Sequence, residues 1–325
     1  MGQQYLRQVS VSIDGGFSFT SDGDNGPRVR FDTHQFVSST PAHANIYVSN
    51  LSKDSYAKLA KENLKFTLSA GYRDGGTSII FSGEIRQARN FREDITDVVT
   101  HIVATSSGNA RNFATLNKTL AAGHTHDDRV QMALSAFKPF GVTAGHIDKL
   151  DGPKFPRGFL ACGMAHQMLR DVCQAREAQW FNVNGRFHVL KAANTLPGST
   201  IVLNSSSGLI GMPEQTIGGV NFQCLLNPLI VPGCKVKIDE SSVVRAAFDP
   251  SVAGQGNNAL LQSGNLMGVQ ADGLYKVLKA EHSGDTRGNQ YFTIGVGVGL
   301  NSDSRELRSI GISDDFNTDA PAAGG

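Results

Sequence analysis

The segment QYFTIGVGVGL, residues 290–300, alternates between two kinds of residue with a period of two. This period is typical of a β-strand, in which successive side chains point to opposite faces. One predicted face is packed core and carries Phe292, Ile294, Val296, Val298 and Leu300. The other face carries Tyr291, Thr293, Gly295, Gly297 and Gly299. Glycine inside a strand often marks a close approach by another chain or a sharp bend. We therefore predict Gly295, Gly297 and Gly299 as subunit-interface residues, with curvature of a barrel as an equally good interpretation.

Similar strands are predicted on both sides of a central region. The first group lies at residues 9–13, 17–19, 29–31, 44–48, 66–72, 78–85 and 98–104, with a short helix from Ser52 to about Lys61. The second group lies at 200–203, 220–226, 235–239, 275–282 and 290–300. A high glycine count, 36 of 325 residues, fits many short strands joined by tight turns.

The central region has a different pattern. Thr125 and Asp128 resemble a capping box that begins a helix running to about Phe137. A second helix is predicted from about Leu160 to Arg176, because apolar residues recur there at helical spacing. Asn184-Gly185 then lies between two apolar runs, which strongly indicates a β-hairpin.

These segments predict four parts. Residues 1–108 form a first β domain, 109–192 an α+β insert, and 193–300 a second β domain. Residues 301–325 form a flexible C-terminal tail. Residues 248–268 are predicted to be a polar loop. The fold class is therefore mainly β with an α+β insert.

Composition excludes several classes of protein. Thirty Lys and Arg residues against 29 Asp and Glu residues give a net charge of +1, without the basic excess of a nucleic-acid-binding protein. No segment has the length of a signal peptide's apolar core or of a membrane span, so no membrane anchor is expected. Cys162 and Cys173 would lie about 16 Å apart in one helix, too far for a disulfide. All four cysteines are predicted to be reduced and packed.

Candidate chemical sites are weak. Residues 124–128, His-Thr-His-Asp-Asp, could hold a metal or act in acid–base chemistry, but capping of a helix explains most of them. Asp32 and His34, near Arg28 and Arg30, are better interpreted as a solvated strand face than as a catalytic group. No nucleophile elbow or phosphate-binding loop is present. We predict no enzyme activity, no cofactor and no metal.

Several stretches carry a resemblance to a known family. They are Gly15-Gly16-Phe17-Ser18-Phe19 after the first strand, Asn50-Leu51-Ser52 before the short helix, and Ile80-Phe81-Ser82-Gly83-Glu84-Ile85. The most specific is Leu225-Leu226-Asn227-Pro228, followed by Val231-Pro232-Gly233 and the strand Cys234–Ile238. In this order they resemble the baseplate hub proteins of contractile-tailed phages, which are related to the hub part of type VI secretion spike proteins.

The resemblance implies two tail-tube-like β-barrels decorated by a small α/β domain. It implies a homotrimer, whose pseudo-sixfold ring adapts a sixfold tail tube to a threefold spike. The implied neighbours are the spike, tail tube, tape-measure and baseplate wedge proteins, and DNA is expected to pass through the lumen without specific binding. The implied place is the virion baseplate, after assembly in the host cytoplasm.

Two other interpretations stay open. The first is another structural tail protein, such as a tube or distal-tail component, which would share the β-rich composition. The second is a carbohydrate-binding or hydrolytic β protein. That protein would need convergent aromatic residues or a carboxylate pair, whereas the single tryptophan, Trp180, lies next to a predicted hairpin and is more simply explained as core.

Overall fold

The computed structural model describes residues 5–14, 16–22, 25–59, 63–216, 219–238, 244–245 and 273–300. Within these residues the chain is mainly β, as predicted. The predicted loop at 248–268 and the predicted tail at 301–325 lie outside the described residues, as does Gly15 of the stretch Gly15-Gly16-Phe17-Ser18-Phe19.

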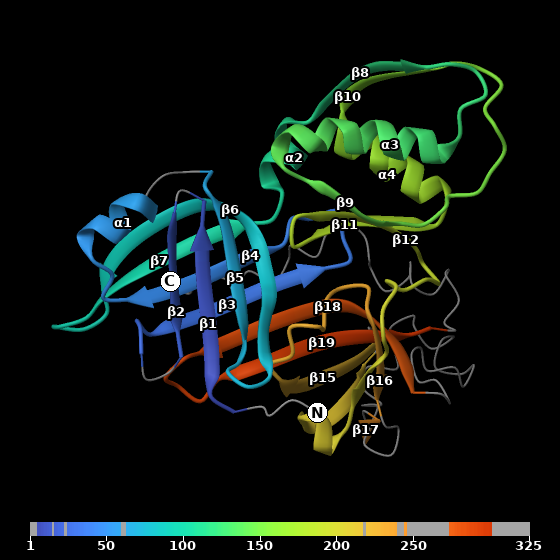
Figure 1. Cartoon of the computed structure of the whole chain (residues 1–325). Coiled ribbons are helices and arrows are strands. Elements are labelled where there is room, and N and C mark those ends of the chain that lie inside the picture. The colour runs from blue at the N-terminus through green and yellow to red at the C-terminus, as the bar shows by residue number, and fades with distance from the viewer. Residues whose placement is uncertain are drawn as a thin grey trace, which may run out of the picture.

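One large sheet runs through both predicted β domains (Figure 1). It has 14 strands, and its main path is β17-β14-β15-β19-β18-β3-β4-β7-β6-β5-β1-β2. The two halves meet where β3 pairs antiparallel with β18, from Phe36 opposite Lys279 to Arg30 opposite Asp285. The described strands thus form one continuous curled sheet and do not close into the two separate barrels that we expected.

The first β unit surrounds a large apolar core. Alternate residues of each strand point inward, as in β3, where buried and half-buried positions alternate along its whole length. Its elements are β1 (Arg7–Ile13), β2 (Phe17–Ser21), β3 (Val29–Phe36), β4 (His43–Ser49), α1 (Lys53–Leu59), β5 (Lys65–Tyr72), β6 (Gly76–Arg92) and β7 (Val98–Thr105). Ser52 accepts a hydrogen bond from the Ser55 N–H (3.1 Å), which confirms it as the cap of α1.

The second β unit has its own smaller core, which includes Phe222 and Tyr275. Its elements are β13 (Ile201–Leu203), a 3₁₀ turn (Ser205–Ser207), β14 (Leu209–Thr216), β15 (Gly219–Leu225), β16 (Lys235–Ile238), β17 (Val244–Arg245), β18 (Leu274–Asp285) and β19 (Tyr291–Gly299). Strand β18 is long enough to pair with β16 near its start and with β3 near its end. It therefore belongs to both halves of the sheet.

The insert packs two helices between two small sheets (Figure 1). Trp180 lies in its core against Phe137 and Phe187, with both ring centroids 6.0 Å away, so its predicted core role is confirmed. The elements are α2 (Gly108–Phe113), β8 (Thr115–Leu120), α3 (His126–Phe137), a 3₁₀ turn (Lys138–Phe140), β9 (Thr143–Ile147), β10 (Phe159–Met164), α4 (Ala165–Ala175), β11 (Ala178–Val183) and β12 (Arg186–Lys191).

A buried lysine ties the insert to the second unit. The Lys276 ammonium on β18 donates to the carbonyl oxygens of Lys191 and Ala192 (3.2 and 3.1 Å). Burial lowers the pKa of Lys276 to about 8. A second contact is apolar, since Val37 of the first unit packs with Phe181 and Leu190 of the insert.

The predicted helix from Leu160 to Arg176 is wrong in its first turn. Residues 159–164 form strand β10, which pairs antiparallel with β8, and helix α4 begins only at Ala165. Gly163 has φ of 124°, which a helix does not contain. Ala161 is buried whereas Leu160 and Cys162 are exposed, so Cys162 neither lies in a helix nor packs as predicted.

The predicted faces of β19 are reversed. The glycine face is buried, together with Tyr291 and Thr293, whereas Ile294 on the opposite face is 39 % exposed and Val298 alone of that face is buried. A Cβ at Gly295 would lie 2.3 Å from the Phe222 ring, and one at Gly297 would lie 3.0 Å from Tyr275. The glycines therefore make room for aromatic side chains of the same chain. The contact of Gly295, Gly297 and Gly299 with another subunit stays a prediction.

Replacing Gly295 by alanine is expected to lower the free energy of unfolding by about 1–3 kcal/mol, because the new methyl group overpacks the core at Phe222. Urea unfolding measures the effect. A matched variant, Gly295→Ala with Phe222→Leu, should recover part of the loss. Unchanged stability of Gly295→Ala, combined with loss of self-association, would instead favour the subunit-interface role.

Candidate functional site: a polar junction beside an open pocket

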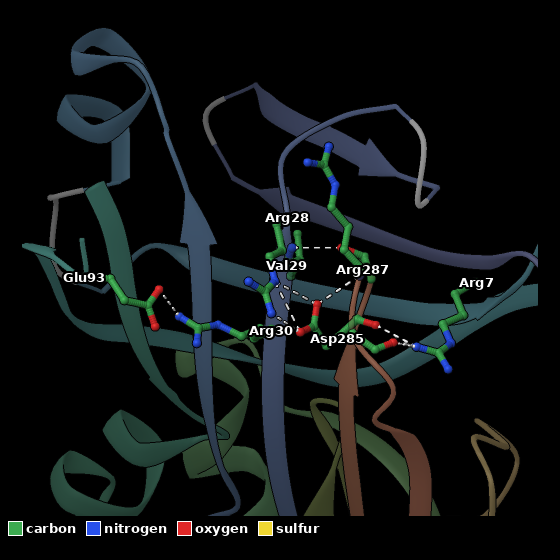
Figure 2. A network of polar contacts seen from close by, with 9 residues as sticks. Arg7, Arg28, Val29, Arg30, Glu93, Asp285 and Arg287 are labelled. Atoms are coloured by element: carbon green, nitrogen blue, oxygen red, sulfur yellow. Dashed lines mark hydrogen bonds and ion pairs between the residues drawn. The ribbon is translucent and has the colours of Figure 1, made fainter. Parts of the chain in front are cut away.

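The β18–β19 turn is held by arginines of the first β unit. Asp285 lies at its start, and its carboxylate accepts hydrogen bonds from Arg28 Nη2 (2.5 Å) and Nε (3.1 and 3.2 Å) and from the backbone N–H of Arg287 (2.9 Å) (Figure 2). Burial alone would raise the pKa of this carboxyl, but these hydrogen bonds hold it below its ordinary value. The ion pair therefore joins residues 257 positions apart in the chain.

Arg7 on β1 holds the same turn from the other side (Figure 2). Its guanidinium donates to the carbonyl oxygens of Asp285 (3.1 Å), Gly288 and Asn289 (3.2 Å). Backbone bonds add to this, because the Thr286 N–H donates to Val29 O and the Val29 N–H donates to Thr286 Oγ1 (both 3.0 Å). The turn of the second unit is thus fixed on the first.

Tyr291 follows this turn and enters the core of the first unit. Its ring packs edge-on against Phe31 and Tyr72, with centroids 6.1 and 5.5 Å away. Its hydroxyl lies 2.8 Å from Gly71 O and 3.0 Å from Gln8 O, and it accepts a bond from the Gly71 N–H (3.1 Å). One side chain from β19 therefore binds strands β1 and β5.

An open pocket lies next to the junction. Its volume is about 870 Å³, and Arg28 and Arg287 line one side of it. Phe17, Phe19 and Leu51 supply apolar surface. The carboxylates of the β6–β7 turn, Glu93, Asp94 and Asp97, also line the pocket. The pocket thus contains apolar surface, two arginines and three carboxylates. Arg28 is paired with Asp285 and Arg287 donates to Gly26 O. The three carboxylates of the β6–β7 turn therefore form an acidic edge, which suits a partner that presents apolar and basic side chains.

A second polar cluster lies on the pairing of β3 with β18. His34 contacts Asp32 through Nε2 (2.6 Å) and Glu281 through Nδ1 (2.5 Å), and its ring stacks on His43 at 4.6 Å. Both ring nitrogens donate in the protonated form. Hydrogen bonds to Asp32 and Glu281 raise the pKa of His34 to about 9. The predicted solvated strand face is thus an ion-pair cluster that joins the two β units.

The His34 cluster predicts a loss of stability at alkaline pH. The pKa of His34 is above its unfolded value, so the stabilisation is complete below about pH 6.5 and is lost as the pH rises through about 9. The side chain is partly exposed, so we expect about 1–2 kcal/mol. Chemical unfolding at pH 6 and pH 9.5 measures it, and His34→Gln should show a smaller difference. An equal difference in both proteins would show that His34 does not contribute.

The cluster at residues 124–128 serves the architecture of the insert. Thr125 and Asp128 form the predicted capping box, and Asp127 accepts from the Leu150 N–H (2.8 Å). His124 stacks on Phe155 with centroids 4.8 Å apart. Within the described part of the chain, no group of three or more His, Cys, Asp or Glu residues is arranged to hold a metal ion. No described helix is long and apolar enough to cross a membrane.

Several known structures have a fold similar to that of this chain. The 43 kDa tail protein of prophage MuSo2 from Shewanella oneidensis matches with a TM-score of 0.58 and 10 % identity, over 90 % of this chain and 98 % of that one. A tail protein from Neisseria meningitidis MC58 matches with a TM-score of 0.56 and 10 % identity, over 90 % and 97 %. The fold of this chain is therefore similar to that of these two tail proteins.

A third similar structure comes from a secretion system. The Escherichia coli c3393 protein is described as a type VI secretion component with structural similarity to the T4 tail proteins gp27 and gp5. It matches with a TM-score of 0.52 and 10 % identity, over 89 % of this chain and 76 % of that one. Neither a protein-family model nor a curated protein sequence matches the chain. The likeness therefore lies in the fold and is nearly absent from the sequence.

Most of the junction could not be found from the sequence. In the sequence Arg28 and Arg30 stand out only as neighbours of Asp32, and no local pattern links Arg7 or Arg28 with Asp285. One signal was available. Asp285-Thr286-Arg287-Gly288 has the Asp and Gly residues of a tight turn between two strong strand patterns.

Proposed function

We propose that the chain is the hub subunit of a phage tail baseplate. The observation that carries this proposal is the pairing of β3 with β18, which joins two β units of one chain side by side in a single sheet. Three such chains would present six β units around an axis. A threefold ring with six similar units matches a sixfold tube on one side and a threefold spike on the other.

The strength of the connection between the two units supports this role. Tyr291, Asp285 and the His34 cluster all join the first unit to the second. An adapter that contacts a sixfold tube and a threefold spike must hold its two β units in a fixed position relative to each other. We propose a structural and non-enzymatic role, in a homotrimer located in the virion baseplate.

The proposed neighbours follow from this position. The tail tube and the spike contact the two ends of the ring, the wedge proteins contact its outside, and the tape-measure protein and DNA occupy the lumen. The fold supports this position. The tail proteins from Shewanella oneidensis and Neisseria meningitidis are similar to this chain over nearly their whole length.

Native mass spectrometry with negative-stain imaging of the full chain tests the proposal. The expected result is a mass of three copies and a ring with a sixfold outline and an open lumen. A ring of six copies would contradict the hub assignment and favour a tail tube component.

A further inference from the structure

A small acidic turn projects beside the pocket. Residues 93–97, Glu-Asp-Ile-Thr-Asp, connect β6 and β7 and are here called the acidic tip. Ile95 is 95 % exposed, and no described core contains it. Arg30 pairs with Glu93 (2.7 Å), and Asn50 donates to Asp97 (3.0 Å). Asp94 takes part in none of the ion pairs of the described residues, so its charge remains available to a partner.

A complementary surface lies on the insert. Residues 152–160, Gly-Pro-Lys-Phe-Pro-Arg-Gly-Phe-Leu, lead from the end of β9 into β10 and are here called the basic loop. The loop carries two cations, Lys154 and Arg157, and no carboxylate. Both cations are exposed, and Leu160 beside them is 65 % exposed. The basic loop thus offers apolar and basic side chains together.

The basic loop is held in place from inside. The Arg129 guanidinium lies between the rings of Phe155 and Phe159, 4.0 Å from each centroid. Two backbone bonds add to this, from the Gly123 N–H to Phe155 O (2.7 Å) and from the Phe155 N–H to His124 O (2.9 Å). A surface that is already ordered loses little conformational entropy on binding. Lys154, Arg157 and Leu160 are therefore presented on a fixed support.

The two surfaces lie at opposite ends of one chain. In Figure 1 the segment between β9 and β10 is at the far right of the insert, whereas α1 and the ends of β6 and β7 are at the far left. A contact within one chain would require the molecule to fold back on itself. A contact between successive copies requires no change in the position of either surface. Head-to-tail contacts of this kind form a ring when the rotation between copies closes.

We propose that the basic loop of one copy docks on the acidic tip and pocket of the next copy. Lys154 and Arg157 would face Asp94 and Glu93, while Leu160 and Ile95 would cover each other and the apolar surface at Phe17 and Leu51. The partner is a second copy of this chain. The inference rests on the proposed ring and adds which two surfaces form its subunit contact.

Charge reversal in the full chain tests the contact. Asp94→Lys and Arg157→Glu each place like charges together and should weaken association about tenfold or more. The double variant places opposite charges together again and should restore the assembly. Asp171→Lys, an exposed site on α4, is the matched control and should assemble like the parent. Masses are measured across a concentration series, with circular dichroism to show that each variant is folded.

The results for the variants support or overturn the proposed contact. Loss of the ring in both single variants, with recovery in the double variant, supports it. An intact ring in both single variants overturns this contact and leaves the hub proposal standing. Loss of the ring without rescue, or a parent chain that is monomeric at every concentration, also overturns it. In the monomeric case, addition of the spike protein then tests the hub proposal separately.

Discussion

Replacing Tyr291 by alanine is expected to lower the free energy of unfolding by about 3–5 kcal/mol. The ring is fully buried in the core of the first β unit, although the residue belongs to β19 of the second. Removal of the side chain leaves a cavity between Phe31 and Tyr72. The carbonyl oxygens of Gly71 and Gln8 also lose their hydrogen bonds to the Tyr291 hydroxyl. Urea unfolding followed by circular dichroism measures the loss.

Two variants separate the contributions at this position. Tyr291→Phe keeps the ring and should lose only about 1–2 kcal/mol, for the hydroxyl contacts. Phe292→Ala, at the next position on the outer face, is the matched control and should cost less than Tyr291→Ala. A cost of Tyr291→Ala no larger than that of Phe292→Ala would contradict the coupling of the two units through Tyr291.

Acid is expected to destabilise the protein strongly between pH 6.5 and pH 4. Burial lowers the pKa of His282 to about 4, and burial with nearby His146 and Arg186 lowers that of His188 to about 4. Both values lie below the unfolded value, so the stability is complete above about pH 6.5 and is lost as the pH falls. Each histidine accounts for up to about 3 kcal/mol at the acid end.

The neutral state of His282 follows from its complete burial, and a hydrogen bond to Thr293 accompanies it. The Thr293 hydroxyl accepts from the Asn227 N–H (3.0 Å), so its own proton is free to go to His282 Nδ1 (2.9 Å). Protonation of His282 would place a charge in this fully buried site, which is why acid destabilises it. Unfolding curves at pH 7 and pH 4.5 measure the effect. His282→Leu should lose about half of the pH dependence, and an unchanged dependence would show that other groups cause it.

Local patterns in the sequence predicted most elements. Alternation located β1, β2 and β19, and the Thr125–Asp128 box located the start of α3. Alternation does not show which face of a strand points into the core. At β19 the apolar face was predicted as the core face, and this prediction is wrong. Apolar side chains seemed to define the core face, but Phe222 and Tyr275 fill the space above Gly295 and Gly297.

The candidate site depends on pairing between distant segments. Strand β18 pairs with β3 across about 250 residues of chain, as the bond between Thr33 Oγ1 and His282 O at a separation of 249 residues shows. Sequence periodicity is local and cannot report such a pairing. Two separate closed barrels are therefore not confirmed, because the described strands form one continuous sheet. The mainly β fold agrees with the prediction.

The measurement that tests the central claim most directly is cryo-electron microscopy of the full chain mixed with its tail tube and spike proteins. We predict a ring of three copies between tube and spike, in which each chain contributes two adjacent β units to a sixfold outline. A chain that stays monomeric in this mixture, or that stacks along the tube as one unit per sixfold position, would contradict the account.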